Sequence, residues 1–133
     1  MEREDVLAYL GGCFYGEPAS CTYACPFRLD LRSFLKKMER GRFDAAYKEL
    51  CSLIPFPLIV SELCGEMCAG ACQCGTVLGG EAIRVRELER ACHRWAKRKS
   101  VPSYAIPRKE QRVAVVGAGI AGLACALTLA RKK

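Results

Sequence analysis

Two stretches of the chain repeat apolar residues at the spacing of one helix face. From Leu31 to Met38, and again from Phe43 to Ile54, apolar side chains recur at positions i, i+3, i+4 and i+7. This spacing predicts two amphipathic helices, each with one face in a shared core. Asp30 is a suitable N-cap for the first helix, because its carboxylate can accept a hydrogen bond from a backbone N–H of the first turn.

Glycine and proline mark the expected ends of these helices. Gly41 ends the first, and Pro55 with Pro57 stops the second. A shorter helix is predicted over 4–10, before a glycine pair. A third long helix is predicted over about 82–97, where these apolar residues share one side: Val85, Leu88, Cys92 and Trp95.

The pattern changes twice in the last part of the chain. Residues 99–111 hold two prolines and mixed charges, which is typical of a linker. A β-branched run, 113–116, then precedes GAGIAG and an alanine-rich segment, so the order predicts a strand, a glycine turn and a helix. The eighteen uncharged residues 113–130 reach the lower limit for a membrane span, but a membrane helix does not explain this order.

Composition narrows the function classes. The chain has 133 residues, of which 51% are hydrophobic, so one packed domain is expected. The net charge is +7, and the basic residues of 84–112 alternate with glutamates without interleaved aromatics. A solvated helix face and a basic linker explain this pattern better than a nucleic-acid interface. The first residues, MEREDVLAYLGG, lack a secretory signal, which predicts a cytoplasmic protein.

Ten cysteines are the main chemical feature. Disulfides are rare in the cytoplasm, so metal ligation is the better explanation. Seven of the ten fall in two loops: Cys13, Cys21 and Cys25, then Cys64, Cys68, Cys72 and Cys74. Their C-x3-C spacings suit zinc, and the Cys25-Pro26 pair suits an iron–sulfur cluster, so both remain open.

The other thiols and the single histidine are expected to be structural. Cys51, Cys92 and Cys125 stand alone within predicted helices and are expected to be small buried apolar residues. His93 lies in a charged helical segment, which favours a surface position. Glu89 borders the apolar face of the same helix, so it can point inward or pair with Arg86 or His93.

The glycine segment has the form G-x-G-x-x-G. Gly117 permits a tight turn, Gly119 lets backbone amides approach a pyrophosphate, and Gly122 lets helix and strand pack closely. The pattern predicts the phosphate-binding start of a dinucleotide domain. One strand and one helix cannot enclose a cofactor, so residues 1–133 are not expected to hold FAD by themselves.

Longer motifs connect these features to a known family. Four motifs follow one another along the chain, and a glycine motif comes after them. In order they are ASCTYACP, LDLRSFLKKMERGRFDAAYKEL, PFPLIVSELCGEMC, EAIRVRELERACHRWA and VAVVGAGIAGL. The arrangement resembles the N-terminal iron–sulfur domain of the glutamate synthase small subunit and of dihydropyrimidine dehydrogenase. The resemblance implies an all-α, α-helical ferredoxin-like domain over 1–98 and a linker over 99–111. Residues 112–133 would then begin an incomplete Rossmann-type FAD/NAD(P)-binding domain.

The family usually carries two 4Fe–4S clusters, and the resemblance implies ligands for them. One complete set is Cys25, Cys68, Cys72 and Glu89. The other set has only Cys13, Cys21 and Cys74, because Gly16 stands at the fourth position. One cluster is therefore expected, and the second is incomplete. Cys64 matches a family cysteine that is not ordinarily a ligand, but it could fill the gap in the second set if the loop folds differently.

The implied function is electron transfer between FAD and a partner. FAD and NADPH are expected only in the complete protein, and the expected partners are its FAD/NAD(P)H domains and a larger catalytic subunit. Neither nucleic acid nor membrane is expected as a partner. No nucleophile–base pair is visible, so residues 1–133 are not expected to be catalytic alone. The alternative is a zinc-stabilised or metal-free helical domain that docks a partner subunit.

Overall fold

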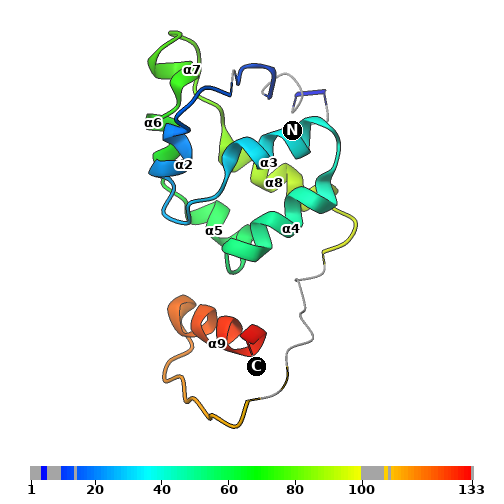
Figure 1. The fold of residues 1–133 in the computed structure, drawn as a ribbon, viewed down its shortest axis with the longest axis vertical. Helices are drawn as coiled ribbons and strands as arrows, with labels where there is room; N and C mark the ends of the chain where they lie inside the picture. The colour runs from blue at the N-terminus through cyan, green and yellow to red at the C-terminus, as the bar shows by residue number, and fades with distance from the viewer. Residues whose placement is uncertain (1–3, 6–9, 14, 100–106, 108, 133) are drawn as a thin grey trace.

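The architecture of the chain is helical. A computed structural model describes residues 4–5, 10–13, 15–99, 107 and 109–132. Helices and loops, without a strand, make up this described part (Figure 1). The expectation of an all-α domain is therefore confirmed for the residues that the structure covers.

Three long helices form the frame of the domain, close to their predicted bounds. They are α3 (Leu31–Glu39), α4 (Phe43–Leu53) and α8 (Val85–Trp95). The apolar periodicity predicted these helices because each of them buries one face. Helix α4 packs between α3 and α8. Of the predicted helix over 4–10, residues 6–9 lie outside the described residues.

Four short helices occupy segments where the periodicity predicts none. They are α2 (Ser20–Ala24), α5 (Pro57–Leu63), α6 (Met67–Gly70) and α7 (Gln73–Thr76). Pro57 does stop α4, but it also stands at the first turn of α5, where a missing N–H costs nothing. The others are too short for a 3.6-residue period to be visible. Two of them, α2 and α6, pack together and join the two cysteine loops.

The core lies where the faces of the long helices meet. Phe34 and Met38 of α3, Leu50 of α4 and Leu88 of α8 are at most 1% exposed. Helix α5 packs against α8 on another side. This core holds the helices in place, and the cysteine loops are attached to its edge.

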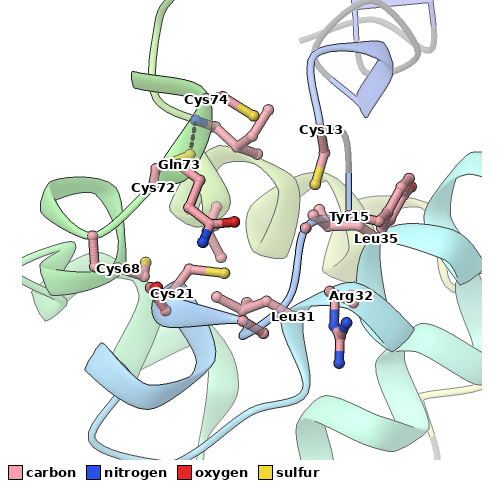
Figure 2. A pocket seen from close by; sticks show the side chains of 16 residues that line it. Cys13, Tyr15, Cys21, Leu31, Arg32, Leu35, Cys68, Cys72, Gln73 and Cys74 are labelled. Atoms are coloured by element: carbon pink, nitrogen blue, oxygen red, sulfur yellow. Dashed lines mark hydrogen bonds between the residues drawn. The ribbon is translucent and has the colours of Figure 1, made fainter. Parts of the chain in front are cut away.

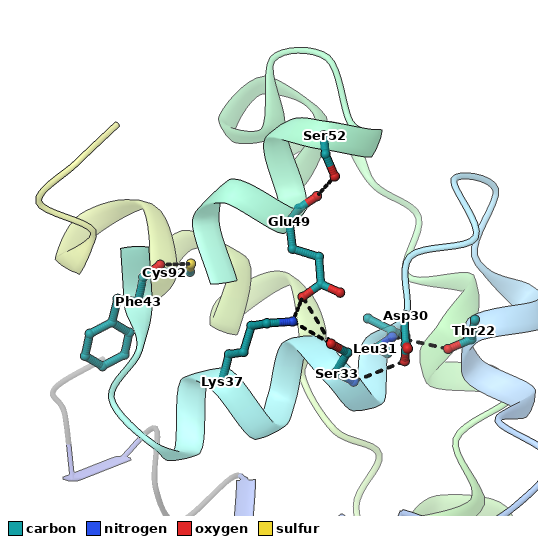
Figure 3. A network of polar contacts seen from close by, with 9 residues as sticks. All are labelled: Thr22, Asp30, Leu31, Ser33, Lys37, Phe43, Glu49, Ser52 and Cys92. Carbon is teal, nitrogen blue, oxygen red and sulfur yellow. Dashed lines mark hydrogen bonds and ion pairs between the residues drawn. The ribbon is translucent and has the colours of Figure 1, made fainter. Parts of the chain in front are cut away.

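A polar network ties α3 to α4 (Figure 3). Lys37 Nζ donates to Glu49 Oε2 at 2.7 Å and to Ser33 Oγ at 2.5 Å. Because these side chains are only partly exposed, the ion pair is less screened than one at the open surface. The network fixes the crossing of the two helices.

The loop between α2 and α3 is held by two hydrogen bonds (Figure 3). Asp30 Oδ1 accepts from the Ser33 N–H at 3.1 Å, so the predicted N-cap is confirmed. The Leu31 N–H donates to Thr22 Oγ1 at 3.2 Å. The bond to Thr22 positions α2, which carries Cys21, the second cysteine of the first loop.

An acidic side chain of α4 fastens the segment after α8. Asp44 Oδ1 accepts from the N–H groups of Lys97 (2.7 Å) and Arg98 (3.0 Å). The hydrogen bond from the Arg98 N–H has the largest effect and lowers the pKa of Asp44. Desolvation acts in the opposite direction, and the bond from the Lys97 N–H adds to the lowering. The chain therefore leaves the helical domain from a defined point.

The C-terminal segment contains α9 (Ile120–Lys132) but not the predicted strand. Residues 113–116 form neither helix nor strand. A β-strand needs a neighbouring strand for its hydrogen bonds, and the described residues contain none. Within these residues, no helix is long and apolar enough to cross a bilayer.

Candidate metal centre

One cavity gathers thiols from both cysteine loops (Figure 2). Cys13 and Cys21 reach it from the first loop, and Cys72 and Cys74 reach it from the segment around α7. The backbone of Gly16 also lines this cavity. Burial raises the pKa of Cys13 and of Cys21 above the ordinary value. Cys68 lines this cavity too but is shared with a second one, so we call the other four cysteines the first thiol site.

Two thiols of the first thiol site have defined hydrogen bonds. Cys74 Sγ donates to the carbonyl oxygen of Gly12 at 2.7 Å. Cys72 Sγ accepts from the Ile83 N–H at 3.5 Å. Burial alone would raise the pKa of Cys72. Hydrogen bonds from backbone N–H groups, of which the Ile83 N–H is the strongest, outweigh burial, so the pKa of Cys72 is lowered. Since the thiolate is the form that binds metals, Cys72 is the best-prepared ligand of this site.

A second cavity lies between α5, α6 and α8. Cys25, Cys64, Cys68 and Glu89 line it, and we call these four residues the second thiol site. The packing of α5 against α8 brings Cys64 to the same cavity as Glu89. The second cavity has a volume of about 230 Å³ against about 40 Å³ for the first, so it has more room for a bound group.

The second thiol site gathers four ionisable side chains in a desolvated place, which favours the neutral forms of Cys68 and Glu89. Burial, then the neighbouring Cys64, Cys25 and Glu89, raises the pKa of Cys68 to about 12. Burial, with a smaller effect of Glu66, raises the pKa of Glu89 to about 7. Grouping four potential anions costs energy. A bound cation or cationic cluster would remove that cost.

The inward position of Glu89 answers the question left open by its helix pattern. Arg86 forms its ion pair with Glu66 at 2.9 Å. Among the described residues Glu89 itself forms no ion pair, and its side chain lines the second cavity. Of the two readings of the helix pattern, the inward one agrees with the structure.

The thiols are grouped differently from the sets that the resemblance implies. Cys13, Cys21 and Cys74 share one cavity, and Cys25, Cys68 and Glu89 share the other, as expected. Cys72, however, lines the first cavity and not the second, while Cys68 lines both. Cys64 does not line the cavity of the incomplete set, where it could have filled the gap at Gly16; it lines the second cavity instead.

The donor set of the two cavities is compatible with an iron–sulfur cluster, because thiols predominate in it. In the described part of the chain, no three Cys, His, Asp or Glu side chains converge as ligands of a single metal ion would. A 4Fe–4S cluster instead takes one ligand at each of four irons, so its ligands surround a cavity. Cysteine thiolates are its usual ligands, and both cavities supply them.

The three remaining cysteines are divided by burial. Cys51 and Cys92 are buried, as predicted, with exposures of 1% and 0%. The prediction for Cys125 is wrong, because this thiol is exposed. It lies on α9, which has no buried residue. His93 is half-buried rather than fully at the surface, with its ring 5.6 Å from that of Tyr47.

Native alkylation is expected to distinguish these thiols. In the folded protein, iodoacetamide at mildly alkaline pH should modify Cys125 quickly and Cys92 only after unfolding. Burial raises the pKa of Cys92 to about 12, so both access and thiolate are lacking there. Peptide mass spectrometry measures the two rates. Equal rates in the native protein would contradict the burial of Cys92.

The glycine segment has the close approach that its pattern predicts. Gly117 has φ +105°, in the region that favours glycine. A Cβ on Gly122 would lie 2.1 Å from the Gly117 carbonyl oxygen, whereas one on Gly119 would meet nothing within 4 Å. Gly122 is thus required for close packing between the turn and α9.

The comparisons with known proteins agree with this site. The family model described as dihydropyrimidine dehydrogenase domain II, 4Fe-4S cluster, matches residues 2–101. The chain belongs to this iron–sulfur family. Both thiol sites lie within the matched residues, so an iron–sulfur role for the domain is supported by its family and by its donor set.

Several oxidoreductases are related to this member of the family. NADPH-Fe(3+) oxidoreductase subunit beta of Geobacter sulfurreducens is 30% identical over 96% of the chain and 20% of that protein. The putative oxidoreductase UacF of Escherichia coli is 35% identical over 90% of the chain and 19% of that protein. Glutamate synthase [NADH] of Schizosaccharomyces pombe is 29% identical over 82% of the chain and 5% of that protein. The chain therefore spans about a fifth or less of the length of these relatives.

Proposed function

We propose that this chain is the electron-transfer module of an NAD(P)H-dependent flavin and iron–sulfur oxidoreductase. The observation that carries the proposal is the gathering of cysteines, distant in sequence, around two cavities of an iron–sulfur family domain. The all-α frame agrees with an α-helical ferredoxin-like fold. A bound 4Fe–4S cluster would supply one-electron chemistry, with a potential set partly by hydrogen bonds to sulfur.

The residues that we propose as iron ligands are six of the seven cysteines in the two loops and one carboxylate. They are Cys13, Cys21, Cys25, Cys68, Cys72, Cys74 and Glu89. These residues would bind the iron atoms, hold the cluster in place and exclude water from it. The N–H of Ile83 contacts Cys72 Sγ, and such bonds to a ligand sulfur stabilise its thiolate form.

The C-terminal residues are proposed to belong to a different unit. Residues 99–111 would be a linker, and residues 112–133 would begin a FAD-binding domain, with Gly117, Gly119 and Gly122 at the pyrophosphate. The turn geometry at Gly122 supports this assignment. NADPH as electron donor is supported by the name of the Geobacter relative. A larger catalytic subunit as the acceptor rests on the likeness to glutamate synthase.

Anaerobic reconstitution tests the function. The protein incubated with iron and sulfide should become brown and retain acid-labile sulfide together with iron. The pair of substitutions Cys21→Ala and Cys68→Ala removes a thiol from each cavity and should abolish most of this uptake. Cys125→Ala, at an exposed thiol on α9, is the matched control and should retain it. Zinc without labile sulfide in the wild-type protein would favour the zinc-stabilised docking domain and overturn the proposal.

A further inference from the structure

A glycine lines the first cavity where a ligand side chain is missing. Gly16 contributes only backbone to the cavity that holds Cys13, Cys21 and Cys74. Three thiols leave one iron of a 4Fe–4S cluster without a protein ligand. A fourth thiol, Cys72, lines the same cavity and is in a position to supply what Gly16 lacks.

Local contacts hold Cys72 at the first thiol site. Cys72 is the N-cap of α7, and α7 is fastened to the first loop because Gln73 Nε2 donates to the Pro18 carbonyl oxygen at 3.2 Å. Cys13 and Cys21 both have Cys72 as an electrostatic neighbour. The Ile83 N–H points at its sulfur. The tight C-x-C spacing therefore places both Cys72 and Cys74 on one cavity.

The second cavity loses Cys72 but contains Cys64. Cys64 is the C-cap of α5, and its Sγ accepts from the Glu66 N–H at 3.4 Å. The carboxylate of Glu66 is paired with Arg86 of α8, so the turn carrying Cys64 is fixed against the helix that carries Glu89. Cys64 is also the first-ranked electrostatic neighbour of Cys68.

The geometry points to a ligand exchange: Cys72 replaces the side chain absent at Gly16 in the first thiol site, and Cys64 takes its place in the second. This inference rests on the proposed iron–sulfur function. It gives the first site four thiolates and the second site three thiolates and a carboxylate. Each cavity then has the four protein ligands that a 4Fe–4S cluster requires, so two clusters are expected. Cys68 lines both cavities, and it is assigned to the second set because its ionisable neighbours Cys64, Cys25 and Glu89 all lie there.

Two double variants, each of which keeps only one thiol site, distinguish the exchanged ligand sets from the sets that the family resemblance implies. These double variants are the two backgrounds for further substitutions. The protein with Cys13→Ala and Cys21→Ala retains only the second site, and the protein with Cys25→Ala and Glu89→Ala retains only the first. Each is reconstituted anaerobically and reduced with dithionite. Iron, labile sulfide and the electron paramagnetic resonance signal are then measured, so that no activity assay is needed.

Opposite effects are expected in the two backgrounds. With only the second site, Cys64→Ala should remove the remaining cluster, and Cys72→Ala should leave it in place. With only the first site, Cys72→Ala should remove the cluster and Cys64→Ala should leave it. A general failure to fold cannot produce this crossed pattern. Cys51→Ala, at a buried thiol that lines neither cavity, should leave the cluster in both backgrounds.

Two results would overturn the exchange. The reversed pattern, with Cys72 needed only for the second site, would restore the grouping that the family resemblance implies. Retention of both clusters in Cys64→Ala would remove Cys64 from the ligands. A wild-type protein that takes up no iron with labile sulfide is a different result, since it overturns the proposed function itself.

Discussion

Replacing Phe34 by alanine is expected to lower the free energy of unfolding by about 3–5 kcal/mol. Phe34 lies on α3 with no exposed surface, in the core where the faces of the long helices meet. Removing the ring loses its transfer free energy and leaves a cavity, because the surrounding helices relax only partly. Against a domain stability of about 5–15 kcal/mol, this is a large share.

Tyr23→Ala is the matched aromatic control for this prediction. Tyr23 is 66% exposed on α2, and its main contact is Arg28, 5.5 Å from the ring centroid. An exposed cation–π contact of this kind contributes about 0.5–1 kcal/mol. Urea unfolding followed by circular dichroism measures the free energy of unfolding of both variants and the wild type. All three proteins are compared with the same cluster content. If Phe34→Ala cost no more than Tyr23→Ala, the assignment of Phe34 to the core would be wrong.

Substituting Gly122 by alanine is expected to open the glycine turn. The new Cβ would lie 2.1 Å from the Gly117 carbonyl oxygen, and a backbone atom cannot rotate away as a side chain can. Relief of such overpacking costs about 1–3 kcal/mol. The Leu123 N–H, which donates to the Gly119 carbonyl at 2.9 Å, should then exchange with solvent about 5- to 150-fold faster, since each 1.4 kcal/mol is a factor of ten.

Gly119→Ala is the control for Gly122→Ala, because a Cβ on Gly119 would meet nothing within 4 Å. Its Leu123 amide should exchange at the wild-type rate. In the complete protein, by contrast, both variants should bind less FAD, since Gly119 is proposed to let backbone approach the pyrophosphate. Wild-type exchange at Leu123 in the Gly122→Ala protein would show that the turn tolerates a side chain there.

The parts of the fold that could be predicted are those with a repeating local pattern. Helices α3, α4 and α8 bury one face, and the burial appears in the sequence as a 3.6-residue period. The Asp30 cap is equally local, since it joins residues three apart. Helices α2, α5, α6 and α7 have at most 7 residues each, too few for the period to appear.

The predicted strand and the buried Cys125 failed for one physical reason. Both depend on partners distant in sequence: a strand needs another strand, and a thiol on α9 needs a surface to cover it. Among the described residues, neither partner is present. The β-branched run 113–116 therefore did not determine the local structure, whereas the glycines after it form the close turn that their pattern predicts.

The sequence alone determined the kind of chemistry in this protein. The number and spacing of the cysteines indicated a metal, the order of the motifs indicated the iron–sulfur family, and G-x-G-x-x-G indicated a nucleotide turn. Only the tertiary structure decided how the thiols are divided. The packing of α2 on α6 and of α5 on α8 places Cys72 at one cavity and Cys64 at the other. Spacing along a chain limits which thiols can meet, but helix packing selects those that do.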